Sequence, residues 1–235
     1  MQPKHILALR DTHKTTPANA NNLLRSLSAL LAWSVPRGWR DDNPCRGIKK
    51  LRIGDGYAPW PWDAIEHFAQ HARPDLWHAG ALALYSGQRL SDVLRMKWND
   101  IHDGLISVRQ GKTGKALWIP VHRRLAAILA SLPRDSVYVL ISTRGRPWTL
   151  DGFKASWSNE LNRDIMKNLR SNRLVFHGLR KSAVVTLLEA GATDAEVAAI
   201  TGQSREIVEH YSRQVNQRKL AAAAILKWET ADGKP

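Results

Sequence analysis

The chain has 235 residues, and its 35 lysines and arginines outnumber its 21 aspartates and glutamates to give a formal charge of +14, which indicates a basic surface whose usual partner is nucleic acid. Its single cysteine, Cys45, excludes an internal disulfide and a zinc site made of several cysteines. No run approaches the roughly 18 apolar residues of a membrane helix, and the N-terminus lacks the apolar core of a secretory signal, so we predict a cytoplasmic, nucleoid-associated protein.

The N-terminal part of the sequence contains one clear helix pattern. A threonine followed by a proline opens a predicted helix over residues 16–36, with leucines recurring on one face. Residues 40–56 are rich in glycine and turn-forming residues and are typical of a linker. One helix and a short preceding segment cannot bury a core. We therefore predict a small, partial helical domain over 1–55 and a larger domain over 56–235.

The larger domain is predicted to be mainly α-helical with a small antiparallel sheet. Two strand-like runs, 105–108 and 116–119, flank a glycine-bounded turn and predict a hairpin. Helical patterns occupy most of the remaining sequence. The predicted helices are 61–72, 76–86, 91–98, 123–131, 149–170, 181–190, 194–201, 205–213 and 214–228.

The region 194–213 is marked by strong boundary signals. Thr193 and Glu196 have the spacing of a capping box, and Gly202 stands where a helix ends. Two short helices joined by a tight turn resemble a helix-turn-helix, so a plain DNA-binding regulator is one alternative hypothesis.

Several residues have side chains suited to phosphate chemistry, although each has an ordinary explanation when taken alone. His177 and Arg180 are three positions apart and project from one helix face, where a guanidinium suits phosphate oxygens and an imidazole can move a proton. Arg89 is predicted in a bend between helices, with Asp92 placed to buttress it, and Tyr211 on a late short helix. A surface pair, a solvated arginine and a core tyrosine are the structural alternatives.

Together, these residues and their neighbours resemble the catalytic signature of the tyrosine recombinase (phage integrase) family. The sequence YSGQRLSD at 85–92 resembles the family's first arginine box, and GKTGK at 111–115 its lysine hairpin. HGLR at 177–180 resembles the second box, and EHYSR at 209–213 the nucleophile box. The resemblance covers roughly residues 60–215 in order. It implies the catalytic fold of the DNA breaking-rejoining enzymes, preceded by part of a SAM-like core-binding region.

The resemblance implies a site-specific recombinase that cleaves DNA through a 3′-phosphotyrosyl intermediate. Tyr211 would be the nucleophile, and His177 would bind the phosphate and help to remove the tyrosine proton. Lys112 would protonate the departing 5′-oxygen, with Lys115 as the alternative. Arg89 and Arg180 would neutralise charge on the non-bridging oxygens. No metal or other cofactor is implied.

Two features depart from the family's pattern. Gln203 stands where the family usually has histidine or tryptophan, and a glutamine amide donates a hydrogen bond but carries no charge. Only the C-terminal portion of the usual N-terminal clamp is recognised, around residues 16–35. A catalytically weakened remnant that only binds DNA is therefore the main alternative function, and a type IB topoisomerase is a related one.

The resemblance also implies partners. They are double-stranded DNA, three further copies of the chain in a tetramer on paired sites, and an accessory DNA-bending or excision factor. The free protein is expected to be a monomer. The sequence 214–228 carries an apolar stripe that either packs on its own domain or contacts a neighbouring copy. Its members are Leu220, Ala221, Ala224, Ile225 and Trp228.

Overall fold

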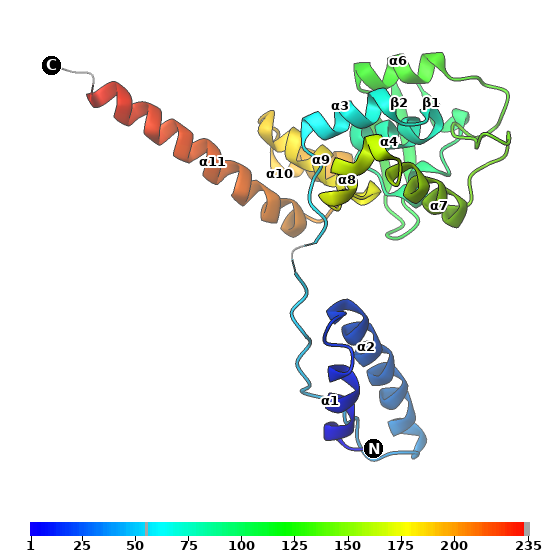
Figure 1. Cartoon of the computed structure of the whole chain (residues 1–235), viewed down its shortest axis with the longest axis vertical. Helices are drawn as coiled ribbons and strands as arrows, with labels where there is room; N and C mark the ends of the chain where they lie inside the picture. The colour runs from blue at the N-terminus through cyan, green and yellow to red at the C-terminus, as the bar shows by residue number, and fades with distance from the viewer. Residues whose placement is uncertain (55, 233–235) are drawn as a thin grey trace. The chain divides into compact units, whose positions relative to one another are not determined.

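The computed structural model describes residues 1–54 and 56–232. The chain forms two compact units, Met1–Gly56 and Tyr57–Pro235, which we call unit 1 and unit 2 (Figure 1). Among the described residues, no helix is both long enough and apolar enough to cross a membrane.

Unit 1 contains two helices, α1 (Pro3–Asp11) and α2 (Pro17–Ser34), followed by the short 3-10 helix η1 (Val35–Arg37). We predicted α2 but not α1, whose nine residues carry a weak pattern. Unit 1 contains a small cluster of buried apolar residues. The Asn21 side chain ties α2 to the following segment through two 2.8 Å hydrogen bonds with the Leu51 backbone. The cluster is Ile6, Leu24 and Cys45, with Leu27, Leu31 and Ile48 against it.

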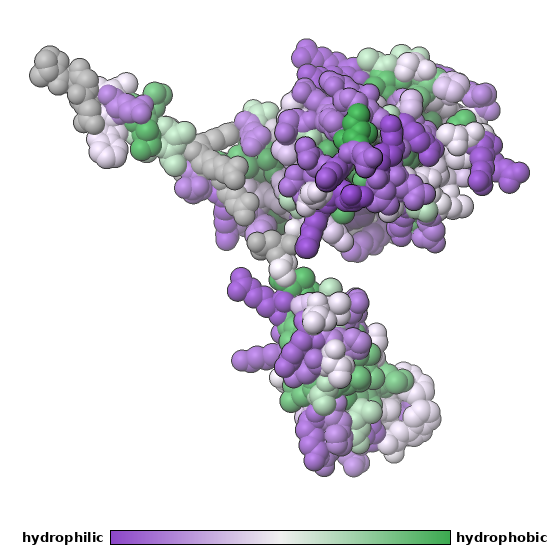
Figure 2. Space-filling view, in the orientation of Figure 1, coloured by the Kyte–Doolittle hydropathy of each residue, from purple (hydrophilic) through white to green (hydrophobic). Residues whose placement is uncertain are grey.

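Unit 2 is built around helix α4 (Pro74–Ser86), which packs along α9 (Phe176–Glu189). α4 is buried on nearly all sides because its sequence is almost wholly apolar, as expected for a central helix. Helix α3 (Trp62–His71) contributes Ile65 and Phe68 to the same core. The face of unit 2 seen in Figure 2 is mostly hydrophilic, in keeping with the basic composition.

The sheet has three antiparallel strands in the order β1 (Ile101–His102), β2 (Leu105–Arg109) and β3 (Ala116–Pro120). The predicted hairpin is β2–β3, and the two-residue strand β1 was not predicted. Ile106 pairs with Ile119, so both isoleucines face the core. Beyond the strands, the Gln110 N–H donates to the Lys115 carbonyl at 2.9 Å, which extends the pairing toward the turn.

The remaining helices of unit 2 differ from the predictions mainly at their ends. The predicted helix 91–98 is only a four-residue turn, and the predicted helix 149–170 is broken at Arg163, whose extended backbone turns the chain so that Met166 and Leu169 reach the core. α9 begins five residues before the predicted start because Phe176 is already buried. The elements are α5 (Leu90–Val93), η2 (Trp98–Asp100), α6 (Arg123–Ser131), α7 (Leu150–Leu161), η3 (Asp164–Met166), α8 (Lys167–Ser171), α10 (Asp194–Thr201) and α11 (Arg205–Asp232).

α11 is one continuous helix of 28 residues, so the prediction of two helices over 205–213 and 214–228 was wrong. Neither glycine nor proline interrupts this stretch. Its first turns bury Val208 and Val215 against α9 and α10, and Figure 1 shows the helix continuing beyond the other elements of unit 2. In the predicted apolar stripe, Ile225 and Trp228 are exposed, and the side chain of Leu220 lies outside the described residues.

Candidate active site

The buried base of the candidate site, which we call its floor, contains Arg180, Gln88 and Gln110 and begins where α4 ends. Gly87 adopts a left-handed conformation with φ +65°, and a Cβ atom there would lie 2.7 Å from a methyl group of Thr201. Only glycine allows α4 to turn at this point with α10 packed so closely. The turn delivers Arg89 to the entrance of α5, where its half-buried guanidinium donates to the side-chain oxygen of Gln110 at 3.2 Å.

Arg180 is the most buried charge of the site, with 2% of its surface exposed. Its Nη1 donates to the Gly87 carbonyl and its Nη2 to the Thr201 carbonyl, the latter at 3.0 Å. Burial, followed by the Arg89 charge, lowers the pKa of Arg180 to about 10. Arg180 therefore remains cationic at neutral pH while its position is fixed from two sides.

His177 lies in the first turn of α9, three positions before Arg180. Its side chain is accessible to solvent, yet the surrounding protein removes part of its hydration, and this desolvation is the largest cause that lowers the pKa of His177. The charges of Arg180, Lys181, Arg89 and Lys112 lower it further. His177 is therefore mainly neutral at pH 7 and is surrounded by cations.

The β2–β3 turn places Lys112 at an exposed tip. Asp92 fixes the base of this turn, because its Oδ1 accepts the Gly111 N–H at 2.9 Å. The same oxygen accepts from Arg95 at 2.7 Å, so Asp92 holds the hairpin rather than Arg89 through its hydrogen bonds. Lys115, the alternative to Lys112, is turned toward the C-terminal end of α10, where its Nζ donates to the Gly202 carbonyl at 3.3 Å.

Tyr211 lies on the second turn of α11 and is half-buried. Its ring packs against the cluster that includes Val184 and Val208, and the Lys181 Nζ lies 5.7 Å from the ring centroid. Tyr211 also lies close enough to Arg180 to influence the pKa of that guanidinium. Because α11 is continuous, the prediction of a short, separate helix for Tyr211 was wrong.

Gln203 occupies the turn between α10 and α11. Its backbone N–H donates to the Thr201 hydroxyl at 3.3 Å, and the preceding Gly202 is left-handed with φ +68°. Among the described residues, the side-chain oxygen of Gln203 is buried without a hydrogen-bond partner. An unpaired buried amide is costly, and a donor or a water molecule at this position would relieve that cost.

Two glutamines that the sequence analysis did not select, Gln88 and Gln110, lie completely buried beneath the arginines. Gln88 belongs to the arginine box, but nothing in its local sequence distinguishes it from a solvated residue. Gln110 ends a strand beside a polar turn, where a surface position is the ordinary expectation. Within residues 1–54 and 56–232, no group of three or more His, Cys, Asp or Glu could hold a metal ion.

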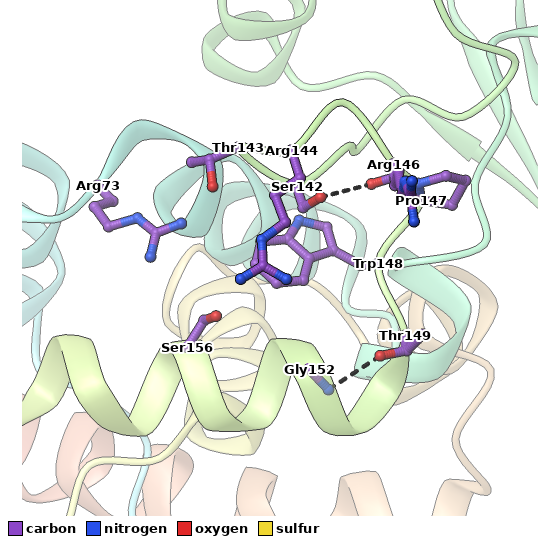
Figure 3. A pocket seen from close by; sticks show the side chains of 10 residues that line it. All are labelled: Arg73, Ser142, Thr143, Arg144, Arg146, Pro147, Trp148, Thr149, Gly152 and Ser156. Carbon is purple, nitrogen blue, oxygen red and sulfur yellow. Dashed lines mark hydrogen bonds between the residues drawn. The ribbon is translucent and has the colours of Figure 1, made fainter.

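A separate cavity of about 460 Å³ lies over α7 and contains none of the predicted site residues. Figure 3 shows Arg73 and Arg144 extending over the same stretch of α7, above Ser156. The loop beside the cavity is held by the Ser142 hydroxyl, which donates to the Arg146 carbonyl at 2.9 Å. Arg144 and Arg146 also line the cavity, so its lining is basic, and Arg73 is paired with Asp75 at 2.7 Å.

The chain is similar to several known integrases. Prophage integrase IntE of Escherichia coli (strain K12) is 45% identical over 76 residues, a match that covers 32% of this chain and only 20% of that protein. A lambda integrase (75–356) dimer bound to a COC′ core site has a TM-score of 0.73 at 22% identity, covering 88% of this chain and 81% of that one. A lambda integrase tetramer bound to a Holliday junction has a TM-score of 0.71 at 23% identity, covering 87% and 65%.

These structural likenesses show the fold, which is that of the tyrosine recombinase catalytic domain, as the sequence predicted. The model of the Phage integrase family matches residues 63–218, which include all six predicted site residues. The chain therefore belongs to the phage integrase family of tyrosine recombinases.

Proposed function

We propose that the chain is a site-specific DNA recombinase that cleaves and rejoins DNA through a phosphotyrosine intermediate. The observation behind this proposal is that a mainly neutral His177 lies within electrostatic reach of Arg89 and Arg180, and Arg180 bonds to the Gly87 carbonyl at the C-terminal end of α4. Tyr211 in turn lies within electrostatic reach of Arg180. Because the match to IntE spans a fifth of that protein, the activity is inferred from the residues of this site.

The reaction assigned to these residues is a transfer of one phosphodiester bond. The Tyr211 oxygen attacks phosphorus, the phenolic proton passes to His177, and the bond from phosphorus to the 5′-oxygen breaks. Lys112 donates a proton to the departing 5′-oxygen. The phosphodiester count is unchanged, so the reverse attack by a 5′-hydroxyl rejoins the strand without an external energy source.

The two arginines stabilise the charge that develops on the non-bridging oxygens. Each is held by neutral acceptors, Arg89 by an amide oxygen and Arg180 by two backbone carbonyls. Among the described residues, no carboxylate forms a direct ion pair with either arginine, which leaves both guanidinium charges available to a phosphate. Such preorganised donors typically contribute about 10²- to 10³-fold each to rate.

The proposal extends to the partners of the chain. Unit 1 is assigned as part of the core-binding region, and its contacts with duplex DNA would add to those of unit 2. The exposed Ile225 and Trp228 on α11 provide an apolar face for a neighbouring copy, in keeping with a tetramer on paired DNA sites. The place of action is the nucleoid, with an accessory DNA-bending or excision protein as a further partner.

Covalent capture tests the proposed chemistry. The assay incubates three proteins, wild type, Tyr211→Phe and Tyr57→Phe, with pooled DNA fragments from around the coding sequence. The mixtures are then denatured in SDS, and any DNA that remains attached to protein is sequenced. Tyr57 is the matched control because it is an exposed tyrosine of unit 2. We expect attachment by wild type and by Tyr57→Phe, and none by Tyr211→Phe.

Each other result has a defined meaning. If the Tyr211→Phe variant still becomes attached to DNA, Tyr211 is not the nucleophile. Binding before denaturation without attachment by any protein would favour the DNA-binding remnant, for which Gln203 is the motivating residue.

A further inference from the structure

Gln110 uses every hydrogen-bonding group that it has. Its side-chain nitrogen donates to the Gln88 side-chain oxygen at 2.7 Å and to the Thr201 carbonyl at 2.9 Å. Its side-chain oxygen accepts from Arg89 at 3.2 Å and from the Thr113 hydroxyl at 2.8 Å. The side chain has no measurable exposure to solvent. A buried amide with all partners in place is held in one orientation, because any rotation leaves groups unpaired.

The four partners come from three separate parts of the site. Arg89 follows the α4–α5 bend. Thr113 belongs to the β2–β3 turn that carries Lys112, which we call the lysine turn. Thr201 is the last residue of α10, just before the turn that leads to α11. Gln88 extends the network by donating to the Ile200 carbonyl at 3.0 Å. Gln110 is therefore the residue through which Arg89, the lysine turn and the C-terminal end of α10 are joined.

The backbone at Gly202 is shaped around this amide. A Cβ atom on Gly202 would lie 2.6 Å from the Gln110 nitrogen, well inside normal contact. Thr201 and Gly202 also provide the carbonyls bonded by Arg180 and Lys115. The close approach means that the amide and the α10–α11 turn cannot move independently.

The choice of an amide also matters for charge. A carboxylate at this position would pair with Arg89 and cancel much of the charge that a phosphate needs. An apolar side chain would leave the guanidinium free to move. An amide oxygen restrains Arg89 and leaves its full charge available.

We propose that Gln110 is a positioning residue of the active site, which holds Arg89 and the lysine turn in place for a phosphate without neutralising the arginine. This inference rests on the proposed function, but its first test does not need DNA cleavage.

The first test uses inorganic phosphate and the full chain without DNA. Side-chain NMR of ¹⁵N-arginine protein follows Arg89 in wild type, Gln110→Leu, Gln110→Glu and Gln70→Leu. Gln70, exposed on α3, is the matched control. In wild type we expect a restrained guanidinium and an NOE to the Gln110 amide. In Gln110→Leu the guanidinium becomes mobile, in Gln110→Glu it stays restrained, and both variants bind phosphate at least about fivefold more weakly than Gln70→Leu.

The second test uses the DNA fragment captured by wild type. Gln110→Leu is expected to slow covalent cleavage at saturating DNA by about 10- to 100-fold, as for a displaced catalytic group, with the affinity for DNA changed less than about twofold. In an Arg89→Lys background the same substitution should cause much less additional loss, because both changes act on one group. A general loss of folding would instead reduce binding and cleavage together.

Three results would overturn the proposal. They are a mobile Arg89 in wild type, unchanged Arg89 mobility and phosphate affinity in Gln110→Leu, and full phosphate affinity in Gln110→Glu. The wild-type measurement decides the matter even if the variants fail to fold. If wild type cleaves no DNA but the phosphate results are as expected, the proposed function fails and the role of Gln110 in holding Arg89 stands.

Discussion

The floor of the candidate site and the helix that carries Tyr211 are held in opposite ways. Beneath the site, Arg180, Gln88 and Gln110 are buried and tied together by short hydrogen bonds. α11 is anchored mainly through Val208 and Val215 in its first turns, and its described residues from 221 to 230 are exposed. Arg180, one of the proposed phosphate-binding groups, is thus built into the core, while the proposed nucleophile lies on a helix attached by a small apolar contact.

The two regions therefore differ in how freely they can move. A rigid set of phosphate-binding groups stabilises charge at no reorganisation cost. A nucleophile on a lightly attached helix can be displaced without disturbing those groups. Substitutions in the floor should therefore change stability and chemistry together, whereas substitutions at the base of α11 should affect chemistry more selectively.

The largest effect is expected from Arg180→Met. Removing the guanidinium leaves the Gly87 carbonyl without its donor, and it deletes one of the two proposed phosphate-binding charges. We expect a loss of about 2–4 kcal/mol in the free energy of unfolding, and a fall of at least about 10²-fold in covalent cleavage. Chemical denaturation and the capture assay measure the two effects. A stable variant with normal cleavage would contradict the description of the floor as one unit.

A smaller, more selective effect is expected from Val208→Ala, which opens a cavity under the first turns of α11. We expect a loss of about 1–3 kcal/mol in the free energy of unfolding, mainly because α11 packs less tightly on α9 and α10. Hydrogen exchange should increase in residues 205–217 and remain unchanged in α4. Ile225→Ala, at an exposed position of the same helix, is the control and should change neither. Equal increases in α4 and α11 would show that the two regions are not separable.

Gln203→His changes the turn between α10 and α11, which lies between the two regions. A histidine would add a group able to carry charge at the turn before α11, so we expect cleavage of a fixed DNA substrate to rise by a few-fold. Single-turnover kinetics at saturating DNA measures it. Slower cleavage would mean that the uncharged amide is the better partner for the phosphate in this site.

The smallest effect is a pH dependence of stability at His177. The pKa of His177 is lowered in the folded protein, so the unfolded chain binds more protons as the pH falls below the ordinary value of about 6.5. The stability that neutral His177 contributes is present above that value and is lost as the pH falls through the folded pKa. In His177→Asn, the free energy of unfolding should decline less between pH 7 and 5. An identical decline would place the titration at other histidines, such as His78 or His122.

Much of this architecture was predictable because the signals are local. Thr193 and Glu196 form the capping box that their spacing indicates, and the β2–β3 hairpin follows from its flanking strands. The break at Arg163 was not predictable, because it depends on burial of Met166 in a core assembled from distant segments. The continuity of α11 was missed because the sequence around Tyr211 was interpreted as a separate short motif.

The candidate site divides in the same way. Arg89, His177 and Tyr211 were selected because their types and order carry chemistry. Gln110 was not, because its role depends on partners such as Thr201 that are 91 positions away. Asp92 was expected to support Arg89, but its hydrogen bonds go to Gly111 and Arg95. Residues that position other residues leave little trace in a single sequence.

The close packing at Gly87 and Gly202 has a consequence for attempts to retarget this protein by directed evolution. Both positions are left-handed, and a side chain at either would collide with Thr201 or Gln110. A saturation library should tolerate as little variety at these glycines as at Tyr211, the proposed nucleophile, although neither glycine has a side chain that could take part in the reaction. Libraries that diversify the surrounding loops while keeping these two codons fixed should retain a far larger share of active clones.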